Sequence, residues 1–256
     1  AEQVAASNYG KPLPIKSSDE LGQLAESFNT MVEGLKERDF ISNTFGRYVD
    51  EEIAKALLNR PEAARLGGEK REVAILMSDL QDFTPMSETL SPEETIKIIN
   101  RYFSRMIEIV RDHGGIIVDF FGDALLVFFD PLDGPVEPVV LKAVECALAM
   151  QNEMDSFNTW NRQEGLPELQ MRIGVNSGEV VVGNIGSESR AKYGIVGSPV
   201  NLTHRIQTVA KAAEVVISES AHRYTEGKFA AERLTDVKLK GVKERENLYV
   251  VKSHRN

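Results

Sequence analysis

From Arg71 onward the chain alternates short apolar runs with long amphipathic stretches, and this order constrains the fold most. The apolar runs have the length and composition of buried strands, and the amphipathic stretches have a helical period. In order, the segments are 72–80 (strand), 91–114 (helix opened by Ser-Pro), 114–129 (hairpin), 137–165 (helix) and 170–187 (strand–turn–strand). This split-βαβ order predicts an α+β sandwich of the ferredoxin-like type, a sheet with helices on one face.

The N-terminal part carries a different pattern, an apolar seam at spacings of three and four. Its members are Leu21, Leu24, Phe28, Met31 and Leu35, preceded by N-cap candidates Ser17, Ser18 and Asp19. The seam predicts a helical or coiled-coil dimer; a solitary amphipathic helix packed on the rest of the chain is the alternative. We therefore divide the chain into 1–38, a helical segment 39–66 with a break at Pro61, and a larger domain 67–256.

Composition excludes some function classes. The 256 residues carry a net charge of −9 and no segment dominated by Lys and Arg, which argues against a dedicated nucleic-acid-binding protein. No run approaches the ~18 apolar residues that a membrane span needs. We expect this piece to be soluble, and because residue 1 is not methionine, we expect that an upstream segment has been removed.

Two aspartates close apolar runs. Asp79 ends the strand at 72–80, and Asp123 follows Phe121 and Gly122 at the bend of the next hairpin. In a split-βαβ sheet these strands are central neighbours, so the two carboxylates can converge. Adjacent carboxylates repel each other unless cations lie between them, as in a two-metal phosphoryl-transfer site. A turn or cap role is the alternative for each aspartate taken alone.

Other polar groups suit the same chemistry. The loop 80–84 after Asp79 can present backbone amides to a triphosphate. Asn201 and Arg205 stand four apart in an expected helix and share a face, so an amide and a guanidinium could orient a ribose and stabilise charge at phosphorus. Alone, such a pair is a very weak signal, and an ordinary helix surface is its default interpretation.

Several segments together resemble a known family. SDLQDFT, GGIIVDFFGDALLVF, RIGVNSGEVVVGNIGS, YGIVGSPVNLTHRIQ and LKGVKE are similar, in this order over roughly 71–251, to the successive motifs of class III nucleotidyl cyclases, the adenylyl and guanylyl cyclases. The stretch DELGQLAESFNTMVEGL resembles the second helix of a HAMP domain. The HAMP resemblance implies a membrane sensor upstream, with this chain at the cytoplasmic face of the cell membrane.

The cyclase resemblance implies a head-to-tail homodimer that binds ATP or GTP with two Mg²⁺ or Mn²⁺ ions at each interface site. The ribose 3′-hydroxyl would attack the α-phosphorus and release pyrophosphate. The implied roles are metal binding for Asp79, Asp123 and the Leu80 backbone carbonyl, catalysis for Asn201 and Arg205 of the other protomer, and substrate binding for Phe83, Thr84, Lys240, Asp119 and Gly194.

Two departures from the family pattern concern the base. A lysine usually stands where Asp119 is found, and Asp or Thr is usual in adenylyl cyclases at Gly194. Guanine presents two donors, N1–H and an amine, that the Asp119 carboxylate can accept, so the residue chemistry favours GTP. Bacterial members more often use ATP, and both substrates stay open. A strand residue that faces solvent without contacting a base is the alternative for Asp119.

A third departure is Asp82, where the family usually has glycine in the phosphate loop. A carboxylate beside a polyanion could weaken nucleotide binding. An alternative function is therefore a weakly active or inactive nucleotide-binding homologue that acts as a HAMP-coupled regulatory dimer. A diguanylate cyclase is disfavoured, because its Gly-Gly-Asp/Glu-Glu-Phe signature is missing from the sequence.

Overall fold

The computed structural model describes residues 9–10, 12–14, 19–45, 66–237, 239 and 246–254. The chain divides into two compact units, Ala1–Asn59 and Arg60–Asn256. None of the helices in the described ranges combines the length and the hydropathy that a membrane crossing needs.

The first unit is built on the helix α2 (Glu20–Phe45). Asp19 caps it, because its Oδ1 accepts hydrogen bonds from the N–H groups of Leu21 (3.1 Å) and Gly22 (3.2 Å). Asn29 holds the preceding connector, since its side chain both accepts from and donates to the backbone of Leu13. The connector therefore returns alongside the helix instead of extending it.

Three of the five predicted seam residues are exposed on α2, and Phe28 and Leu35 are half-buried. Leu21, Leu24 and Met31 are 72%, 66% and 52% exposed in the single chain. Large apolar side chains at helical spacing are rarely left in water, so this face is suited to a partner helix. Of the predicted helical segment 39–66, α2 covers the part to Phe45, and the expected break at Pro61 lies outside the described residues.

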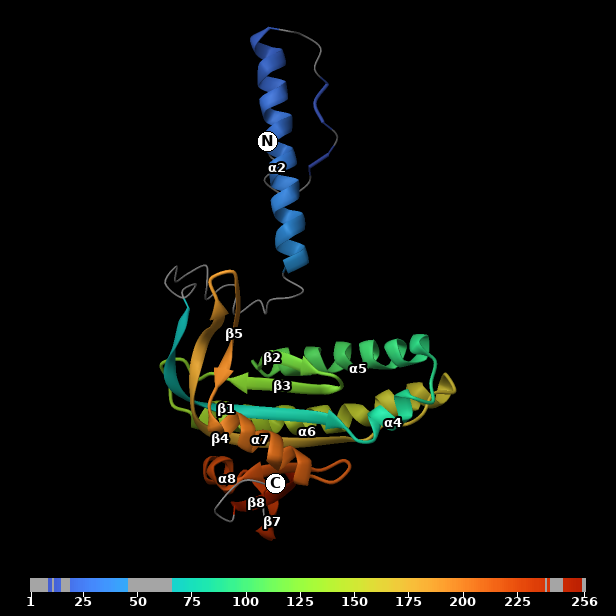
Figure 1. Cartoon of the computed structure of the whole chain (residues 1–256), viewed down its shortest axis with the longest axis vertical. Coiled ribbons are helices and arrows are strands. Elements are labelled where there is room, and N and C mark those ends of the chain that lie inside the picture. The colour runs from blue at the N-terminus through green and yellow to red at the C-terminus, as the bar shows by residue number, and fades with distance from the viewer. Residues whose placement is uncertain are drawn as a thin grey trace. The chain divides into compact units, whose positions relative to one another are not determined.

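The second unit contains one eight-stranded sheet with helices around it (Figure 1). The strands are β1 (Gly67–Leu80), β2 (Ile116–Phe121), β3 (Ala124–Phe129), β4 (Met171–Ser187), β5 (Arg190–Val196), β6 (Val215–Ser218), β7 (Phe229–Val237) and β8 (Glu246–His254). The helices are α4 (Phe83–Ser87), α5 (Pro92–Asp112), α6 (Glu137–Gln163), α7 (Ser198–Val209) and α8 (Glu219–Thr225). The strand order is β2-β3-β1-β4-β6-β8-β7, and β5 pairs with β4.

Local sequence explains the main boundaries. Ser91 and Glu94 form a reciprocal capping box at the start of α5, with Pro92 in the first turn, as the Ser-Pro signal predicts. The β2–β3 hairpin turns at Gly122, whose φ of +67° is easy only for glycine. The hairpin with Phe121-Gly122-Asp123 at its bend is thus confirmed.

Helices cover both faces of the sheet, so the expectation of helices on one face is wrong. The largest core lies where α5, α6 and α8 pack on one face, through residues such as Ile98, Met150 and Ala221. On the other face, Ile206 of α7 packs with Val216 of β6. The cause is visible in the strands, because β3 is buried at every position and β1 over most of its second half, so both faces need cover.

The predicted strand–turn–strand at 170–187 is also wrong. β4 runs unbroken through Ser177 and Gly178, which pair with Ala74 and Val73 of the equally long β1. Gly178 is needed for a close approach and not for a turn: a Cβ there would lie 2.8 Å from the Pro199 ring at the start of α7. The reversal comes later, between β4 and β5.

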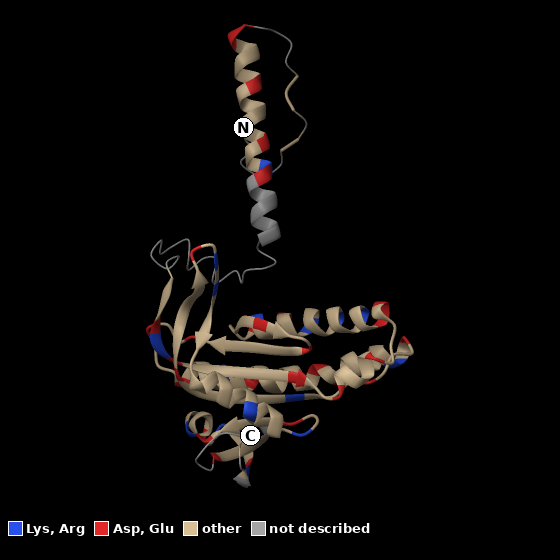
Figure 2. Ribbon diagram, in the orientation of Figure 1, with Lys and Arg blue, Asp and Glu red and all other residues tan. Residues whose placement is uncertain are grey.

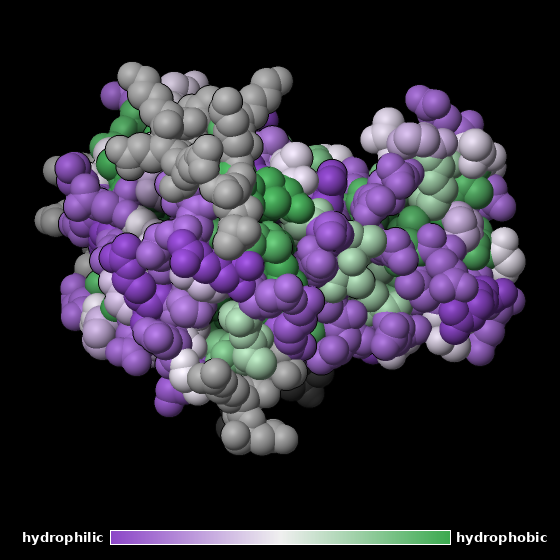
Figure 3. Space-filling view, turned by 90° about the horizontal axis from the view of Figure 1, so that it is seen from below, coloured by the Kyte–Doolittle hydropathy of each residue, from purple (hydrophilic) through white to green (hydrophobic). Residues whose placement is uncertain are grey.

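Charge and hydropathy are mixed over the surface. Lys and Arg alternate with Asp and Glu over the described residues, without a continuous basic stripe (Figure 2). The face seen in Figure 3 has small apolar patches surrounded by hydrophilic residues.

Candidate active site

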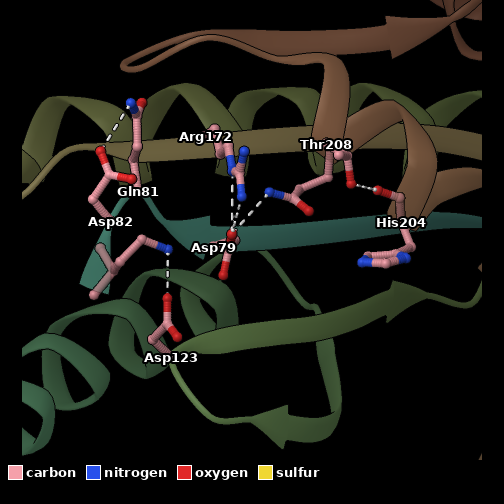
Figure 4. A network of polar contacts seen from close by, with 9 residues as sticks. Asp79, Gln81, Asp82, Asp123, Arg172, His204 and Thr208 are labelled. Carbon is pink, nitrogen blue, oxygen red and sulfur yellow. Dashed lines mark hydrogen bonds and ion pairs between the residues drawn. The ribbon is translucent and has the colours of Figure 1, made fainter. Parts of the chain in front are cut away.

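Asp79 and Asp123 lie together at one end of the central strands (Figure 4). Asp79 is the penultimate residue of β1, and Asp123 sits in the bend that leads into β3, the strand next to β1. Asp123 is fixed there because its Oδ2 accepts a hydrogen bond of 3.0 Å from the N–H of Leu80. The convergence that the sequence predicts is therefore present within one protomer.

Asp79 perturbs the ionisation of Asp123. Burial raises the pKa of Asp123 to about 6, and the adjacent Asp79 adds to this rise, while the Leu80 N–H opposes it. A second negative charge nearby always disfavours ionisation of the first. A divalent cation between them would remove this conflict, so the pair could hold such an ion.

Donors from the rest of the sheet also fix Asp79. Arg172, on β4, donates from Nε at 3.1 Å and from Nη2 at 2.7 Å to Oδ2 of Asp79. Gln207, on α7, donates to the same oxygen at 3.4 Å. The sequence reasoning missed both residues. An arginine inside the apolar strand run Met171–Val175 was the available signal, since such a charge needs a buried partner.

These residues fit a magnesium or manganese site with few protein ligands. Within the described residues, no cluster of three or more His, Cys, Asp or Glu side chains could hold a metal ion. Mg²⁺ is commonly held by one or two carboxylates together with water and substrate phosphates. The two aspartates with the Leu80 carbonyl match that donor set, in which phosphate oxygens complete the coordination.

The predicted phosphate loop follows directly. Asp82 adopts a left-handed conformation (φ 56°, ψ 22°) just before α4, which glycine adopts easily and aspartate tolerates. The Gln81 amide donates to the Asp82 carboxylate at 3.3 Å. Phe83 opens α4 and packs against the large core, and the adjacent Thr84 is exposed.

Asn201 and Arg205 are not at the aspartates of their own chain. Both line a separate cleft of about 570 Å³ with Ser177, Glu219 and other residues of β4, α8 and β8, and neither Asp79 nor Asp123 reaches it. Asn201 and Gln207 are six residues apart on α7, so at 100° per residue their side chains point about 120° apart. Of the two, Gln207 is the residue that hydrogen-bonds to Asp79. Lys240 lies outside the described residues.

The two predicted base-reading positions are close to each other. Asp119 on β2 pairs with Lys192 on β5 at 2.5 Å, and its other oxygen accepts from the N–H of Phe120 at 2.9 Å. Gly194 is two residues after Lys192 on the same strand, and a Cβ there would lie 3.0 Å from Val118. Asp119 is therefore ion-paired, and Lys192 is a third residue that the sequence reasoning missed.

Two families match the sequence. Residues 68–253 match the adenylate and guanylate cyclase catalytic domain, and residues 1–37 match the HAMP domain. Among curated proteins, the uncharacterized protein Rv1319c of Mycobacterium tuberculosis is 36% identical over 203 residues, which cover 78% of this chain and 35% of the relative. The uncharacterized protein Mb1354c of Mycobacterium bovis is 35% identical over 213 residues, covering 82% and 35%. The chain thus spans about a third of the length of these relatives.

Solved structures give the same picture. The guanylyl cyclase Cya2 is 39% identical with a TM-score of 0.69, covering 74% of this chain and 96% of that one. The adenylyl cyclase CyaB from P. aeruginosa is 29% identical with a TM-score of 0.71, covering 74% and 98%. The guanylate cyclase domain of RhGC from Catenaria anguillulae, in complex with GTP, is 26% identical with a TM-score of 0.66, covering 73% and all of that chain. The predicted fold class and both resemblances are confirmed.

Proposed function

The chain belongs to the adenylate and guanylate cyclase family, and we propose that it converts a purine nucleoside triphosphate to a 3′,5′-cyclic nucleotide and pyrophosphate at sites shared by two copies. The observation that carries this proposal is the separation of two functional sets. Asp79 and Asp123 converge at one place, whereas Asn201 and Arg205 line a different cleft of the same chain. Neither set alone provides both cation ligands and groups for the ribose and phosphorus.

Each set has a distinct task. Asp79, Asp123 and the Leu80 carbonyl would hold two divalent ions, which supply positive charge to the triphosphate and acidify the attacking hydroxyl. From the second protomer, the Asn201 amide would orient the ribose, and the Arg205 guanidinium would meet charge that develops on the α-phosphoryl group. The 3′-hydroxyl would then lose its proton to solvent, its oxygen would form a bond to the α-phosphorus, and the bond from that phosphorus to the pyrophosphate oxygen would break.

A dimer surface is available on the sheet. Apolar side chains remain 36% to 54% exposed on β2 and on the β4–β5 hairpin: Phe120, Phe121, Val181, Ile185 and Val196. Val181 and Val196 are direct partners in the β4–β5 ladder, so they lie on one face of the hairpin. The proposal requires that a second copy cover this surface with its α7 facing the aspartates of the first.

For the base, the Asp119–Lys192 pair favours guanine. The carboxylate can accept from N1–H and from the 2-amine of guanine, while the ammonium donates to O6. Adenine offers that pair one donor and one acceptor, so it would form one hydrogen bond fewer than guanine. A charge-assisted bond contributes about 1.5–3 kcal/mol, or about tenfold or more in preference. The similarity to the guanylyl cyclase Cya2 points the same way, and ATP is the second candidate.

Complementation between inactive variants tests the shared site. D79N and R205A homodimers each lack one set, but a mixed dimer contains one complete site, so mixing them should restore part of the activity. A mixture of D79N with D123N is the matched control, because both lack the same set. The assay supplies Mn²⁺ with ATP or GTP in parallel and measures both cyclic products. Failure of the D79N and R205A mixture to recover activity, with wild type active, would refute the shared site.

A catalytically silent regulatory dimer is the second candidate function. The observation in its favour is Asp82, a negatively charged residue at a left-handed position of the phosphate loop. The same assay separates the two functions. Nucleotide binding without either cyclic product, in Mg²⁺ and in Mn²⁺, would establish the silent dimer in place of the enzyme.

The HAMP match at residues 1–37 suggests how the enzyme is controlled. The exposed Leu21, Leu24 and Met31 would pair two α2 helices, and movement there would alter how the catalytic domains meet. The full protein would then sit at the cytoplasmic face of a membrane below a sensor. Deleting residues 1–66 should change dimerisation or turnover, and unchanged values of both would reject the coupling.

A further inference from the structure

The helix α7 is tied to the strand beneath it by one buried amide. We propose that Asn176 of β4 and Ser220 of α8 are positioning residues that fix α7 on the sheet. They would hold the helix so that its Asn201 and Arg205 stand where the reaction needs them. This inference rests on the proposed function, because it concerns how two groups of that site are oriented. Both residues would act through the backbone of α7 and not on the reacting atoms.

The first argument comes from the face of β4 under α7. Side chains two apart on a strand share a face, so Gly174, Asn176 and Gly178 point the same way. The glycines let the helix come close. A Cβ at Gly174 would lie 2.5 Å from the Gln207 backbone nitrogen, and a Cβ at Gly178 would lie 2.8 Å from the Pro199 ring. Asn176 lies between these two close approaches and is 1% exposed, so its amide needs partners there.

The second argument is the hydrogen bond that this amide makes. Nδ2 of Asn176 donates to the carbonyl oxygen of Pro199 at 3.2 Å. Thr203 donates to the same oxygen from Oγ1 at 2.8 Å. The N-cap residue of α7, Gly197, supplies no side-chain hydrogen bond. The first turn of α7 is thus tied to the strand by Asn176, without support from a side-chain cap.

The third argument is where the catalytic groups stand on the helix. Thr203 is fully buried and marks the side of α7 that faces the sheet. At 100° per residue, Asn201 and Arg205 each point about 160° away from Thr203, on the outer side. A shift or rotation of α7 on β4 would therefore move both groups together. A misplacement of about 1 Å can cost about 100-fold in rate.

Ser220 orients the Asn176 amide from the other side. Its hydroxyl lies 3.1 Å from Oδ1 of Asn176 and 2.8 Å from the carbonyl oxygen of Ser177, and it donates to these two acceptors. With the amide oxygen facing a donor, the amide nitrogen faces Pro199. Asn176, Ser177 and Ser220 line the same cleft as the two catalytic residues of α7. The support is therefore built directly behind the groups that it positions.

The experiment measures steady-state kinetics with Mn²⁺ and both purine nucleoside triphosphates. N176A should lower kcat about 10–100-fold with little change in KM, because the displaced groups act mainly in the transition state. S220A should lower kcat severalfold, and S220T, which keeps the hydroxyl, should restore it. If Ser220 acts through Asn176, the N176A/S220A double variant should be about as fast as N176A alone.

Two further measurements exclude a general loss of structure. Thermal unfolding shows whether each variant is folded at the assay temperature. The binding stoichiometry of a 2′,3′-dideoxy nucleoside triphosphate, which lacks the attacking hydroxyl, shows what fraction of the sites is intact. Both should match wild type closely enough that a smaller number of intact sites does not account for the fall in kcat.

N161A is the matched control. Asn161 of α6 is also a fully buried asparagine, and its Nδ2 donates to a proline carbonyl, that of Pro167, at 2.8 Å. It packs on the face of the sheet opposite to α7. N161A should therefore reduce stability and leave kcat unchanged.

The outcomes are distinct. Wild-type kcat in folded N176A, or an equal fall of kcat in N161A, would overturn the inference and leave the proposed function standing. So would losses that multiply in N176A/S220A. If N176A does not fold, S220A against S220T decides, and equal kcat in these two variants would overturn the inference. If wild type forms neither cyclic product with Mg²⁺ or Mn²⁺, the proposed function fails and this inference fails with it.

Discussion

Gly174 of β4 lies directly beneath Gln207 of α7: a Cβ on Gly174 would stand 2.5 Å from the Gln207 backbone nitrogen and 2.8 Å from its Cα. Because these are backbone atoms of a helix, the contact can be relieved only if the helix shifts. The close packing of α7 on the sheet therefore fixes the distance between Gln207 and Asp79.

Gly174→Ala should push α7 away from the sheet. We expect a loss of about 1–3 kcal/mol in the free energy of unfolding, as for other overpacked sites, and weaker Mn²⁺ binding, because Gln207 would leave Asp79. Urea unfolding measures the first effect. Gly34→Ala is the matched control: its Cβ would meet nothing within 4 Å, and in the middle of α2 it should stabilise the helix by up to about 1 kcal/mol. Equal effects of the two substitutions would contradict the close approach.

Asp123→Asn tests the conflict between the carboxylates. The raised pKa of Asp123, about 6 against an ordinary 3.8, means that the folded state binds a proton more tightly than the unfolded state. Metal-free wild type should therefore lose stability as pH rises from about 4 to about 6, and the deficit should remain above that window. D123N keeps an acceptor for the Leu80 N–H but removes the charge, so it should abolish the deficit.

Unfolding in EDTA at pH 8 and at pH 4 measures this difference. D123N should have a larger free energy of unfolding than wild type at pH 8 and the same value at pH 4. Because the Asp123 carboxyl is only about half buried, solvent screening reduces the expected difference at pH 8 to about 1 kcal/mol. D133N, in an exposed loop, corrects for the change in net charge. A gain of the same size at both pH values would show that the charge of Asp123 is not its source. Mn²⁺ should stabilise wild type and not D123N.

The strand and helix order was predictable because each signal is local. The Ser-Pro helix start at Ser91 and the apolar runs that end at Asp79 and precede Asp123 can be recognised without knowing what packs on them. The features that the sequence analysis did not predict depend on pairing between distant residues. Arg172 meets Asp79 across 93 positions, which requires the β1–β4 register, and that register also keeps β4 straight through Gly178, where glycine suggested a turn.

Substitutions at Asp82 can separate two effects of this residue, its left-handed backbone conformation and its negative charge. D82G should relieve the left-handed backbone and stabilise the protein by about 1 kcal/mol, and it also removes a negative charge from the phosphate loop. D82N removes the charge while asparagine tolerates the same conformation. If the charge faces the triphosphate, both variants should lower the KM for nucleotide severalfold, while only D82G changes stability. A KM that stays the same in D82N would place the carboxylate away from the phosphates.

Base preference offers the last test, at Asp119 and Lys192. K192M should lower kcat/KM for GTP about tenfold, because O6 loses its donor, and should lower it less for ATP if guanine is the base that this pair reads. K70M is a suitable control, because Lys70 pairs with Glu179 on an exposed surface. This variant should change neither value of kcat/KM.

The converse change, D119K with G194T, should move preference toward ATP. It needs V118A as well, because any side chain at position 194 would press on Val118 at 3.0 Å. A GTP/ATP ratio that none of these substitutions alters would show that the base is read elsewhere.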